Sequence, residues 1–128
     1  MFSAADLIHT YSRAEAIEDG TLVDAGDLAR EAGFRFPVAM TRAAFEDLVA
    51  WDDTNLGIQD EAGRLWDVLW MARLAAKSAT GGDRAACSVL RVPNTPRATK
   101  PRLARFVMVV GPGDDLEPVV TIQLHGED

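Results

Sequence analysis

The chain has 128 residues, of which 48% are hydrophobic and 26% are charged, and its formal net charge is −7. This length is typical of one domain with its own core, and the apolar content excludes an intrinsically disordered chain. The acidic balance argues against nucleic-acid binding by the whole surface, although it leaves room for a local basic patch.

The sequence carries no sign of secretion or of membrane insertion. Because Cys87 is the single cysteine, no intramolecular disulfide is possible, and we expect a cytoplasmic protein. The first residues lack the basic start and the apolar core of a signal peptide. No apolar run reaches the roughly 18 residues that a membrane span needs, so we expect no membrane contact.

Charge is sorted along the chain. Residues 1–63 carry 13 acidic and 4 basic side chains. Residues 64–111 carry 2 acidic and 9 basic side chains, and residues 112–128 carry 5 acidic and no basic side chains. Segregation of this kind indicates long-range fields and charged partners, and it says little about the fold.

The first predicted helix covers residues 13–19. Ser12 and Glu15 have the spacing of a capping box in front of it, and Gly20 stands where a left-handed C-terminal cap would end it.

The next segments alternate between extended and helical patterns. We expect a short extended piece at 21–23 and a second helix that starts at Asp24 or Gly26 and runs through Ala32. Residues 34–38 alternate apolar and polar side chains but contain a proline, which predicts an extended or edge segment. Thr41 is a candidate N-cap for a third helix over 42–51.

The most apolar segment is 64–77, which we expect to form a central helix. Its apolar side chains cover almost the whole helix circumference, a pattern typical of a buried helix. Trp66 and Trp70 are four residues apart and therefore share one face. Residues 52–63, before this helix, are predicted to be an acidic loop.

Three strands are predicted in the C-terminal half, over 86–92, 103–110 and 118–124, because each has an apolar period near two. Turn-rich links join them, which favours an antiparallel meander. In the first strand, the side chains expected to face the central helix are Ala86, Ser88, Leu90 and Val92.

The predicted fold class is therefore α+β, as a single domain over 1–128. A small antiparallel sheet of about three strands in the C-terminal half would pack against the N-terminal helices. The central buried helix near 64–77 would lie against Leu90, Phe106, Met108 and Ile122 of the sheet.

Acidic residues of the N-terminal half are the first candidate site. An acidic face can bind a basic partner and can imitate the phosphates of DNA, although such charges also serve as a plain solubilising surface. The residues predicted to bind a partner are Glu15, Glu18, Asp19, Asp52 and Asp53.

A basic, proline-rich segment within 91–105 is the second candidate site. Arginine and lysine dominate contacts to nucleic-acid backbones, which makes the segment a candidate phosphate-binding loop. No aromatic side chain interleaves with the cations, which weakens binding of single strands by base stacking. A solvated hairpin loop remains the alternative. The candidate residues are Arg97, Lys100, Arg102 and Arg105.

A third candidate is a small-ligand or enzymatic site around Asp67, Trp66 and Trp70. A carboxylate on a mostly buried helix needs a partner, so the alternative is a structural ion pair with Arg64 or Arg42. No zinc spacing, no complete EF-hand register and no nucleophile motif occurs in the sequence. We therefore expect no metal and no cofactor, and the sequence favours a non-enzymatic role.

Segments 11–20, 29–51, 63–72 and 109–128 together resemble a family of small uncharacterised bacterial proteins encoded on plasmids and integrative elements. The resemblance implies no activity, cofactor or catalytic residue, because the family has none established. It implies a setting among the accessory genes of mobile DNA, a class that includes antirestriction and other anti-defence proteins.

The sequence thus predicts a non-enzymatic accessory protein of a mobile element that binds a host or element-encoded protein through its acidic surface. Nucleic-acid binding by the basic segment is the first alternative, and a site around Asp67 is the second. A homodimer in which basic loops of one copy meet acidic helices of another is also open.

Overall fold

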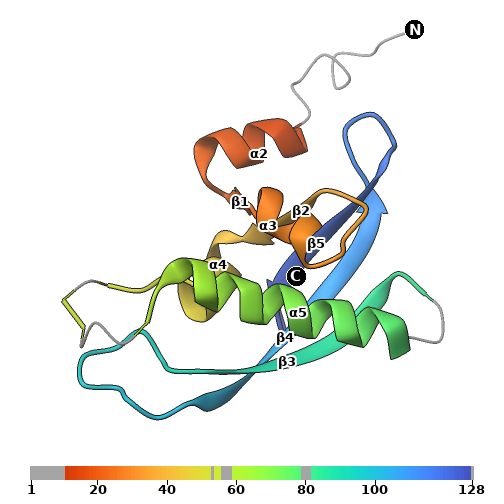
Figure 1. Cartoon of the computed structure of the whole chain (residues 1–128). Coiled ribbons are helices and arrows are strands. Elements are labelled where there is room, and N and C mark those ends of the chain that lie inside the picture. The colour runs from red at the N-terminus through yellow and green to blue at the C-terminus, as the bar shows by residue number, and fades with distance from the viewer. Residues whose placement is uncertain (1–10, 53, 56–58, 79–81, 128) are drawn as a thin grey trace, which may run out of the picture.

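Capping signals in the sequence determine where the first helix begins and ends. In the computed structural model (Figure 1), which describes residues 11–52, 54–55, 59–78 and 82–127, helix α2 spans Arg13–Asp19. The Ser12 hydroxyl accepts a hydrogen bond from the Glu15 amide at 3.1 Å, and Gly20 ends the helix at φ +87°. The predicted capping box and left-handed cap are both confirmed.

Two further short helices follow. Helix α3 spans Asp27–Glu31, and helix α4 spans Arg42–Leu48 with the Thr41 hydroxyl accepting from the Ala44 amide at 3.1 Å. The prediction that the third helix reaches residue 51 is wrong. At Val49 the backbone leaves helical geometry, and the Val49 carbonyl accepts a hydrogen bond from Arg64 Nε at 2.7 Å.

The sheet has five strands rather than three, and it is mixed rather than antiparallel. Its strands are β1 (Leu22–Asp24), β2 (Val38–Thr41), β3 (Arg84–Arg91), β4 (Arg102–Pro112) and β5 (Pro118–Leu124), in the spatial order β1-β2-β5-β4-β3. The predicted antiparallel meander of β3, β4 and β5 is confirmed. In addition, β2 pairs parallel with β5, and β1 pairs antiparallel with β2.

Of the segment 34–38, which was predicted to be extended or at an edge, only Val38 lies in a strand, and that strand, β2, is in the interior of the sheet rather than at an edge. Pro37 stands immediately before the strand, and its carbonyl accepts a hydrogen bond from the Val120 amide at 2.8 Å. A proline that precedes a strand removes no donor from the ladder, which explains why it does not force the segment to an edge.

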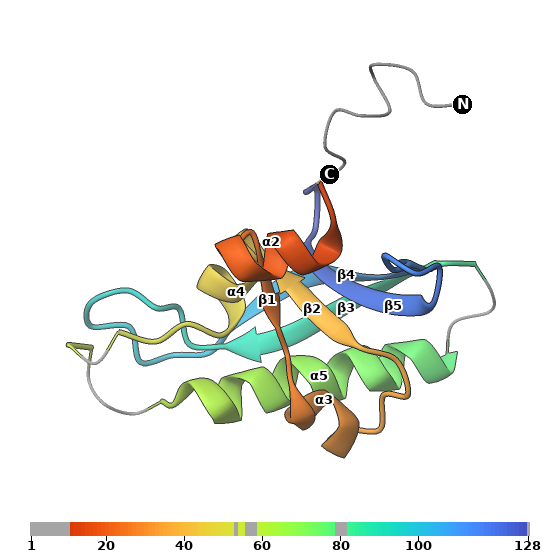
Figure 2. The same cartoon turned by 90° about the horizontal axis from the view of Figure 1, so that it is seen from above.

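Helix α5 (Glu61–Ser78) lies along one face of the sheet together with α3, and α2 lies on the opposite face (Figure 2). The core between α5 and the sheet is apolar, and the predicted contacts of the central helix with Phe106, Met108 and Ile122 agree with this core. Its buried members include Met40, Leu48, Val68, Leu69, Ala72, Phe106, Met108 and Ile122.

The expectation that α5 is buried all round is wrong. Trp70, Met71 and Leu74 are 44%, 36% and 41% exposed, because the sheet covers only one side of the helix. The helix also begins at Glu61 and so takes in the end of the predicted acidic loop. Neither α5 nor any other helix in the described ranges is long and apolar enough to cross a membrane.

The predicted inward face of β3 is also wrong. Ala85, Cys87 and Val89 are buried towards α5, whereas Ala86 is exposed and Leu90 is 64% exposed. Both alternating sets of this strand are largely apolar, so a period of two cannot select the face, and a shift of one residue reverses every side chain. Val92 is buried, but it lies beyond the end of the strand.

Candidate functional site

The strand order separates part of the acidic charge from the basic charge. Strand β1, with α2 beside it, forms one edge of the sheet, and β3 forms the other. The acidic residues of α2, β1 and α3 therefore lie near the β1 edge. The β3–β4 hairpin, which holds most of the basic residues of segment 64–111, lies at the far edge (Figure 1).

The hairpin brings together all four cations of the second candidate site. Arg97 and Lys100 lie in the loop between β3 and β4, and Arg102 and Arg105 lie on β4. All four are exposed. Within the described part of the chain, none of these side chains forms an ion pair or a hydrogen bond with another residue. Arg102 and Arg105 are three residues apart on a strand, so their side chains project to opposite faces of the hairpin.

A fifth cation of the hairpin is already paired. Arg91, at the end of β3, donates two hydrogen bonds to Asp47 Oδ1, from Nε at 3.0 Å and from Nη2 at 2.7 Å. Asp47 belongs to α4, so this pair joins the acidic half of the sequence to the basic half. Its effect is to remove Arg91 from the charge that the hairpin presents to a partner.

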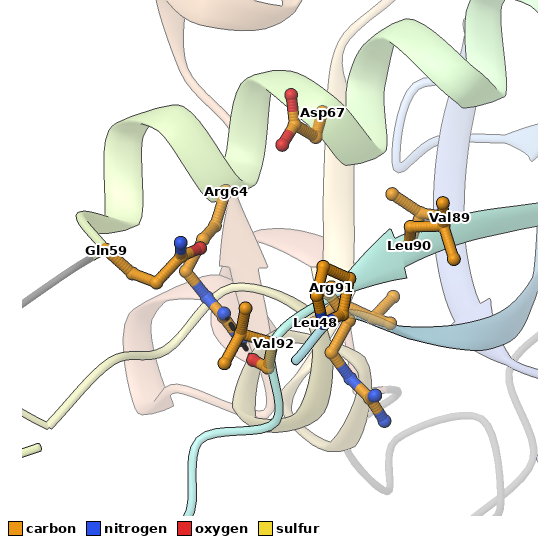
Figure 3. Close-up of a pocket in the computed structure, with 9 residues that line it drawn as sticks. Leu48, Gln59, Arg64, Asp67, Val89, Leu90, Arg91 and Val92 are labelled. Carbon is orange, nitrogen blue, oxygen red and sulfur yellow. Dashed lines mark hydrogen bonds between the residues drawn. The ribbon is translucent and has the colours of Figure 1, made fainter. Parts of the chain in front are cut away.

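Arg64 holds the base of the hairpin in place. Its side chain is buried, with the residue 3% exposed, and its guanidinium donates from Nε to the Val49 carbonyl at 2.7 Å. From Nη1 it donates to the Val92 carbonyl, also at 2.7 Å (Figure 3). The same group lies over the Trp51 ring at 5.0 Å from its centre. Burial lowers the pKa of Arg64 from its ordinary value, and the nearby Arg91 lowers it further.

Arg64 is the structural residue that sequence reasoning missed, since the sequence suggests it only as a partner for Asp67. An arginine at the start of an apolar helix was the only signal for it. The side-chain oxygen of Asn94 adds a second tie, because it accepts from the Asp52 amide at 2.9 Å and from Asn55 Nδ2 at 2.5 Å. These contacts fix the start of the hairpin loop on the segment between α4 and α5.

The acidic residues proposed from the sequence do not all lie together. Glu15, Glu18 and Asp19 are on α2, at the β1 side of the sheet, whereas Asp52 lies beside Asn94 at the base of the hairpin. Asp53 lies outside the described residues.

Several of these carboxylates have a structural role. Glu15 completes the capping box of α2, and Asp19 accepts hydrogen bonds from the Tyr11 hydroxyl and the Thr21 amide. These hydrogen bonds lower the pKa of Asp19, and the bond from Tyr11 has the largest effect. The amide and hydroxyl of Thr54 act in the same way on Asp52 and lower its pKa.

The same role recurs elsewhere in the chain. Asp24 accepts from the Gly26 amide at 3.1 Å, and Asp60 accepts from the Gly63 amide at 2.5 Å. Asp114, on the turn between β4 and β5, accepts from the amides of Arg13 and Ala14 at 2.8 and 3.0 Å and so caps α2 across the sequence. Much of the negative charge therefore stabilises turns and helix ends, whereas the free hairpin cations stabilise nothing that is described.

The site around Asp67 is open rather than enclosed. Trp66 and Trp70 stack with their ring centres 5.9 Å apart, and they do share one face of α5. Asp67 is exposed, and within the described residues it forms no ion pair with Arg64 or with Arg42, which binds Glu46 instead. The predicted structural ion pair is therefore wrong.

Asp67 borders two neighbouring depressions, of about 180 Å³ (Figure 3) and 370 Å³. Neither is lined by a histidine, a cysteine, a lysine or a second carboxylate among the described residues. General acid–base catalysis needs a proton donor and acceptor of matched pKa within reach of a substrate. A lone exposed carboxylate gives weak support to an enzymatic site.

These features define an α+β protein with a mixed five-stranded sheet, helices on both faces and a basic hairpin at one edge. Over residues 1–128 the chain matches the model of a family of unknown function, DUF6573, and it belongs to that family. No curated protein and no solved structure matches it. The resemblance to a family without an established function is confirmed at that level.

Proposed function

We propose that this protein is a non-enzymatic binding module whose β3–β4 hairpin contacts the phosphate backbone of a nucleic acid. One observation carries the proposal: the hairpin presents Arg97, Lys100, Arg102 and Arg105 exposed and unpaired within the described residues. Each cation that neutralises a phosphate releases condensed counterions, which drives association without any need for an apolar interface.

Duplex DNA is the form that the hairpin favours. A two-stranded β-ribbon fits the major groove of B-form DNA, and cations on both of its faces can reach the phosphates on either side. Residues 91–105 contain no aromatic side chain on which an unpaired base could stack. The net charge of −7 opposes binding by the rest of the surface, so we expect a modest affinity that falls steeply with salt.

The resemblance to proteins of plasmids and integrative elements supports the same proposal. An accessory protein of mobile DNA works in the presence of the element's own duplex, and contact with that duplex would place it beside host enzymes that handle DNA. The proposed role is thus an accessory one, and the setting favours an anti-defence function.

Fluorescence anisotropy with a labelled duplex at low salt tests the proposal. We expect binding whose logarithm of affinity falls with the logarithm of salt concentration with a slope of about −3 to −4, as expected for four phosphate contacts. The variant Arg97→Gln/Lys100→Gln/Arg105→Gln should lose most of this affinity and of the slope.

A matched control variant has the same net charge as the hairpin variant. The variant Arg30→Gln/Arg35→Gln/Lys77→Gln removes three exposed cations that lie away from the hairpin, so both triple variants carry the same net charge. The control should bind like the parent protein. Equal loss in both variants would show that only overall charge matters, and no binding by the parent at low salt would overturn the proposal.

A second candidate is binding of a basic partner by an acidic surface at the β1 edge, where Glu18 is one of the residues expected from the sequence. Glu18, Asp27 and Glu31 are exposed there, on α2 and α3. A basic host protein would bind this edge electrostatically. Co-purification with DNA-handling proteins at low and at high salt tests it, and a complex that Glu18→Gln/Glu31→Gln leaves unchanged would contradict it.

A further inference from the structure

Strand β3 has an open backbone edge. It is the last strand of the sheet, and within the described residues only β4 pairs with it. The Val110 amide donates to the Asp83 carbonyl at 2.8 Å, which identifies residues 83 and 110 as a hydrogen-bonded pair of the ladder. Since such pairs alternate along antiparallel strands, the backbone groups that point outwards are those of Arg84, Ala86, Ser88 and Leu90.

In the described part of the chain, this edge lacks the features that normally protect an edge strand. Natural sheets shield edge strands by making them short, by placing proline, bulges or charges on them, or by covering them. Strand β3 has eight residues, an unbroken register with β4 and no proline, and its charged residues stand only at its two ends. Strand β1, the opposite edge, has three residues and α2 beside it.

Exposed apolar side chains gather beside the same edge. Trp70 and Met71 of α5 line the depression of about 370 Å³ together with Leu90 and Leu103. Leu90 and Leu103 are 64% and 61% exposed and lie opposite each other on β3 and β4. Five of the eight large hydrophobic side chains that are exposed in the described structure lie on α5, β3 or β4, namely Trp70, Met71, Leu74, Leu90 and Leu103. Such a patch is typical of an interface.

We propose that this edge is a homodimer interface, in which β3 pairs antiparallel with β3 of a second copy about a two-fold axis at Cys87. This register is the one in which all four outward-facing residues find partners, Arg84 with Leu90 and Ala86 with Ser88 of the other copy. The result is a continuous ten-stranded sheet, with the two basic hairpin loops at opposite ends of the new strand pair.

The charges of the edge fit this arrangement. Asp83 comes opposite Arg91 of the second copy, which has the opposite charge. Arg84 comes opposite Leu90 of the second copy, and Leu90 borders the same depression as Asp67. Like charges on β3 are kept apart by the antiparallel direction, and Arg91 is already compensated by Asp47. A second copy therefore meets the edge without the like-charge contacts that destabilise strand pairs.

Light scattering of the eluting protein, with the variant Ser88→Pro, tests the proposal. The parent protein should be a dimer at high concentration. Proline at position 88 removes an outward-facing amide but no hydrogen bond to β4. The variant should therefore keep its fold, as judged by circular dichroism, and should no longer form a dimer. The matched control Ser88→Ala keeps the amide and should remain dimeric.

Disulfide trapping tests the register in a Cys87→Ala background. We expect Ala86→Cys mixed with Ser88→Cys to form a disulfide-linked dimer under mild oxidation. In the proposed register, position 86 of one copy faces position 88 of the other, and neither position faces itself. Either variant alone should cross-link much less. Strong linkage of Ser88→Cys with itself would overturn the register.

Three results would overturn the interface itself: a monomeric parent protein at all concentrations, a dimer that survives Ser88→Pro, or an edge that takes up a different protein strand in preference to a second copy. The outcome is separable from the proposed function, because Ser88→Pro keeps the four hairpin cations and the triple hairpin variant keeps the edge. Duplex binding by each variant therefore shows which of the two proposals has failed.

Discussion

Asp47 belongs to the acidic segment 1–63 and Arg91 to the basic segment 64–111, yet the two form the shortest ion pair of the described structure, with Nη2 2.7 Å from Oδ1. The pair fastens the end of β3 to the end of α4. It also shows that the acidic and basic segments partly neutralise one another at the base of the hairpin, while the hairpin tip and β4 keep their unpaired cations.

The Arg91–Asp47 pair should contribute modestly to stability. The Arg91 side chain is 16% exposed and the Asp47 side chain is 38% exposed, so solvent screens the pair only in part. We expect Asp47→Asn to lower the free energy of unfolding by about 1 kcal/mol in a urea titration, and less at high salt. Glu46→Gln, which removes the more exposed pair with Arg42, should cost under about 0.5 kcal/mol. Equal effects of the two changes would contradict this assignment.

Arg64 should be more important for stability than any exposed cation. Arg64→Met keeps most of the side-chain volume but leaves the buried carbonyls of Val49 and Val92 without their donors. Unsatisfied buried acceptors are costly, so we expect a loss of about 3 kcal/mol in the urea titration. Arg64→Lys retains a cation but cannot reach both carbonyls, and it should fall between.

Arg73 provides the comparison for Arg64, because its Nε donates to the exposed Gly33 carbonyl at 3.2 Å. Arg73→Met should change stability by about 0.5 kcal/mol or less. An apolar residue sometimes replaces a buried charge without loss. If Arg64→Met were as stable as the parent protein, the two carbonyls would have found other partners, and the role given to Arg64 would be wrong.

Asp114 should make stability depend on pH. The amides of Arg13 and Ala14 lower its pKa in the folded protein, so the folded state binds fewer protons than the unfolded chain. Its contribution is therefore present above the ordinary carboxyl pKa near 4 and is lost as the pH falls through the lower folded pKa. We expect Asp114→Ala to lower the melting temperature at pH 7, and the difference from the parent protein to shrink as the pH drops towards 3.

The neighbouring Asp115 is the control for Asp114, because its side chain forms no described hydrogen bond with α2. Asp115→Ala should leave the melting temperature close to that of the parent protein at both pH values. A pH-independent loss in Asp114→Ala would point to packing rather than to the ionised cap.

Cys87 should react slowly with thiol reagents in the native protein. Burial raises the pKa of its thiol to about 11, so at pH 8 only about a thousandth of the thiol is ionised. We expect slow modification of the native protein by a disulfide reagent and fast modification in denaturant. Because the unfolded thiol ionises more easily, stability should also fall as the pH rises above about 8.5.

The adjacent position gives the contrast for Cys87. In a Cys87→Ala background, Ser88→Cys places a thiol on the open face of β3, where Ser88 is partly exposed. This thiol should react far faster than Cys87 at the same pH. Similar rates for the two thiols would contradict the buried position of Cys87.

Local patterns predicted much of the fold because their causes are local. The caps at Ser12, Gly20 and Thr41 act within one helical turn, so the starts of α2 and α4 could be read directly. The strands β3, β4 and β5 were predicted within a few residues, since each carries its own alternation and its own turns. The pairing of β2 with β5 joins segments about 80 residues apart, and no local signal encodes it.

The candidate site shows the same division. The four hairpin cations could be selected from the sequence, because their density is visible there. Whether a given cation is free or bound could not be predicted, because its partner can be distant in the sequence. Arg91 is paired with a residue 44 positions away, and Arg64 donates to carbonyls of other segments. The acidic residues looked alike in the sequence, and only their hydrogen bonds distinguish caps such as Asp114 from exposed charge such as Glu18.

The sequence by itself determined the α+β class, the capped helix ends at Ser12, Gly20 and Thr41, the C-terminal meander and the location of the basic hairpin, because propensity, capping and periodicity act over a few residues. Only the tertiary structure decided the inward face of β3, the exposure of Trp70 and the open edge beside it, and the burial of Arg64. Those features depend on which surfaces meet when distant segments pack, and a pattern that is apolar on both faces leaves that choice to the whole fold.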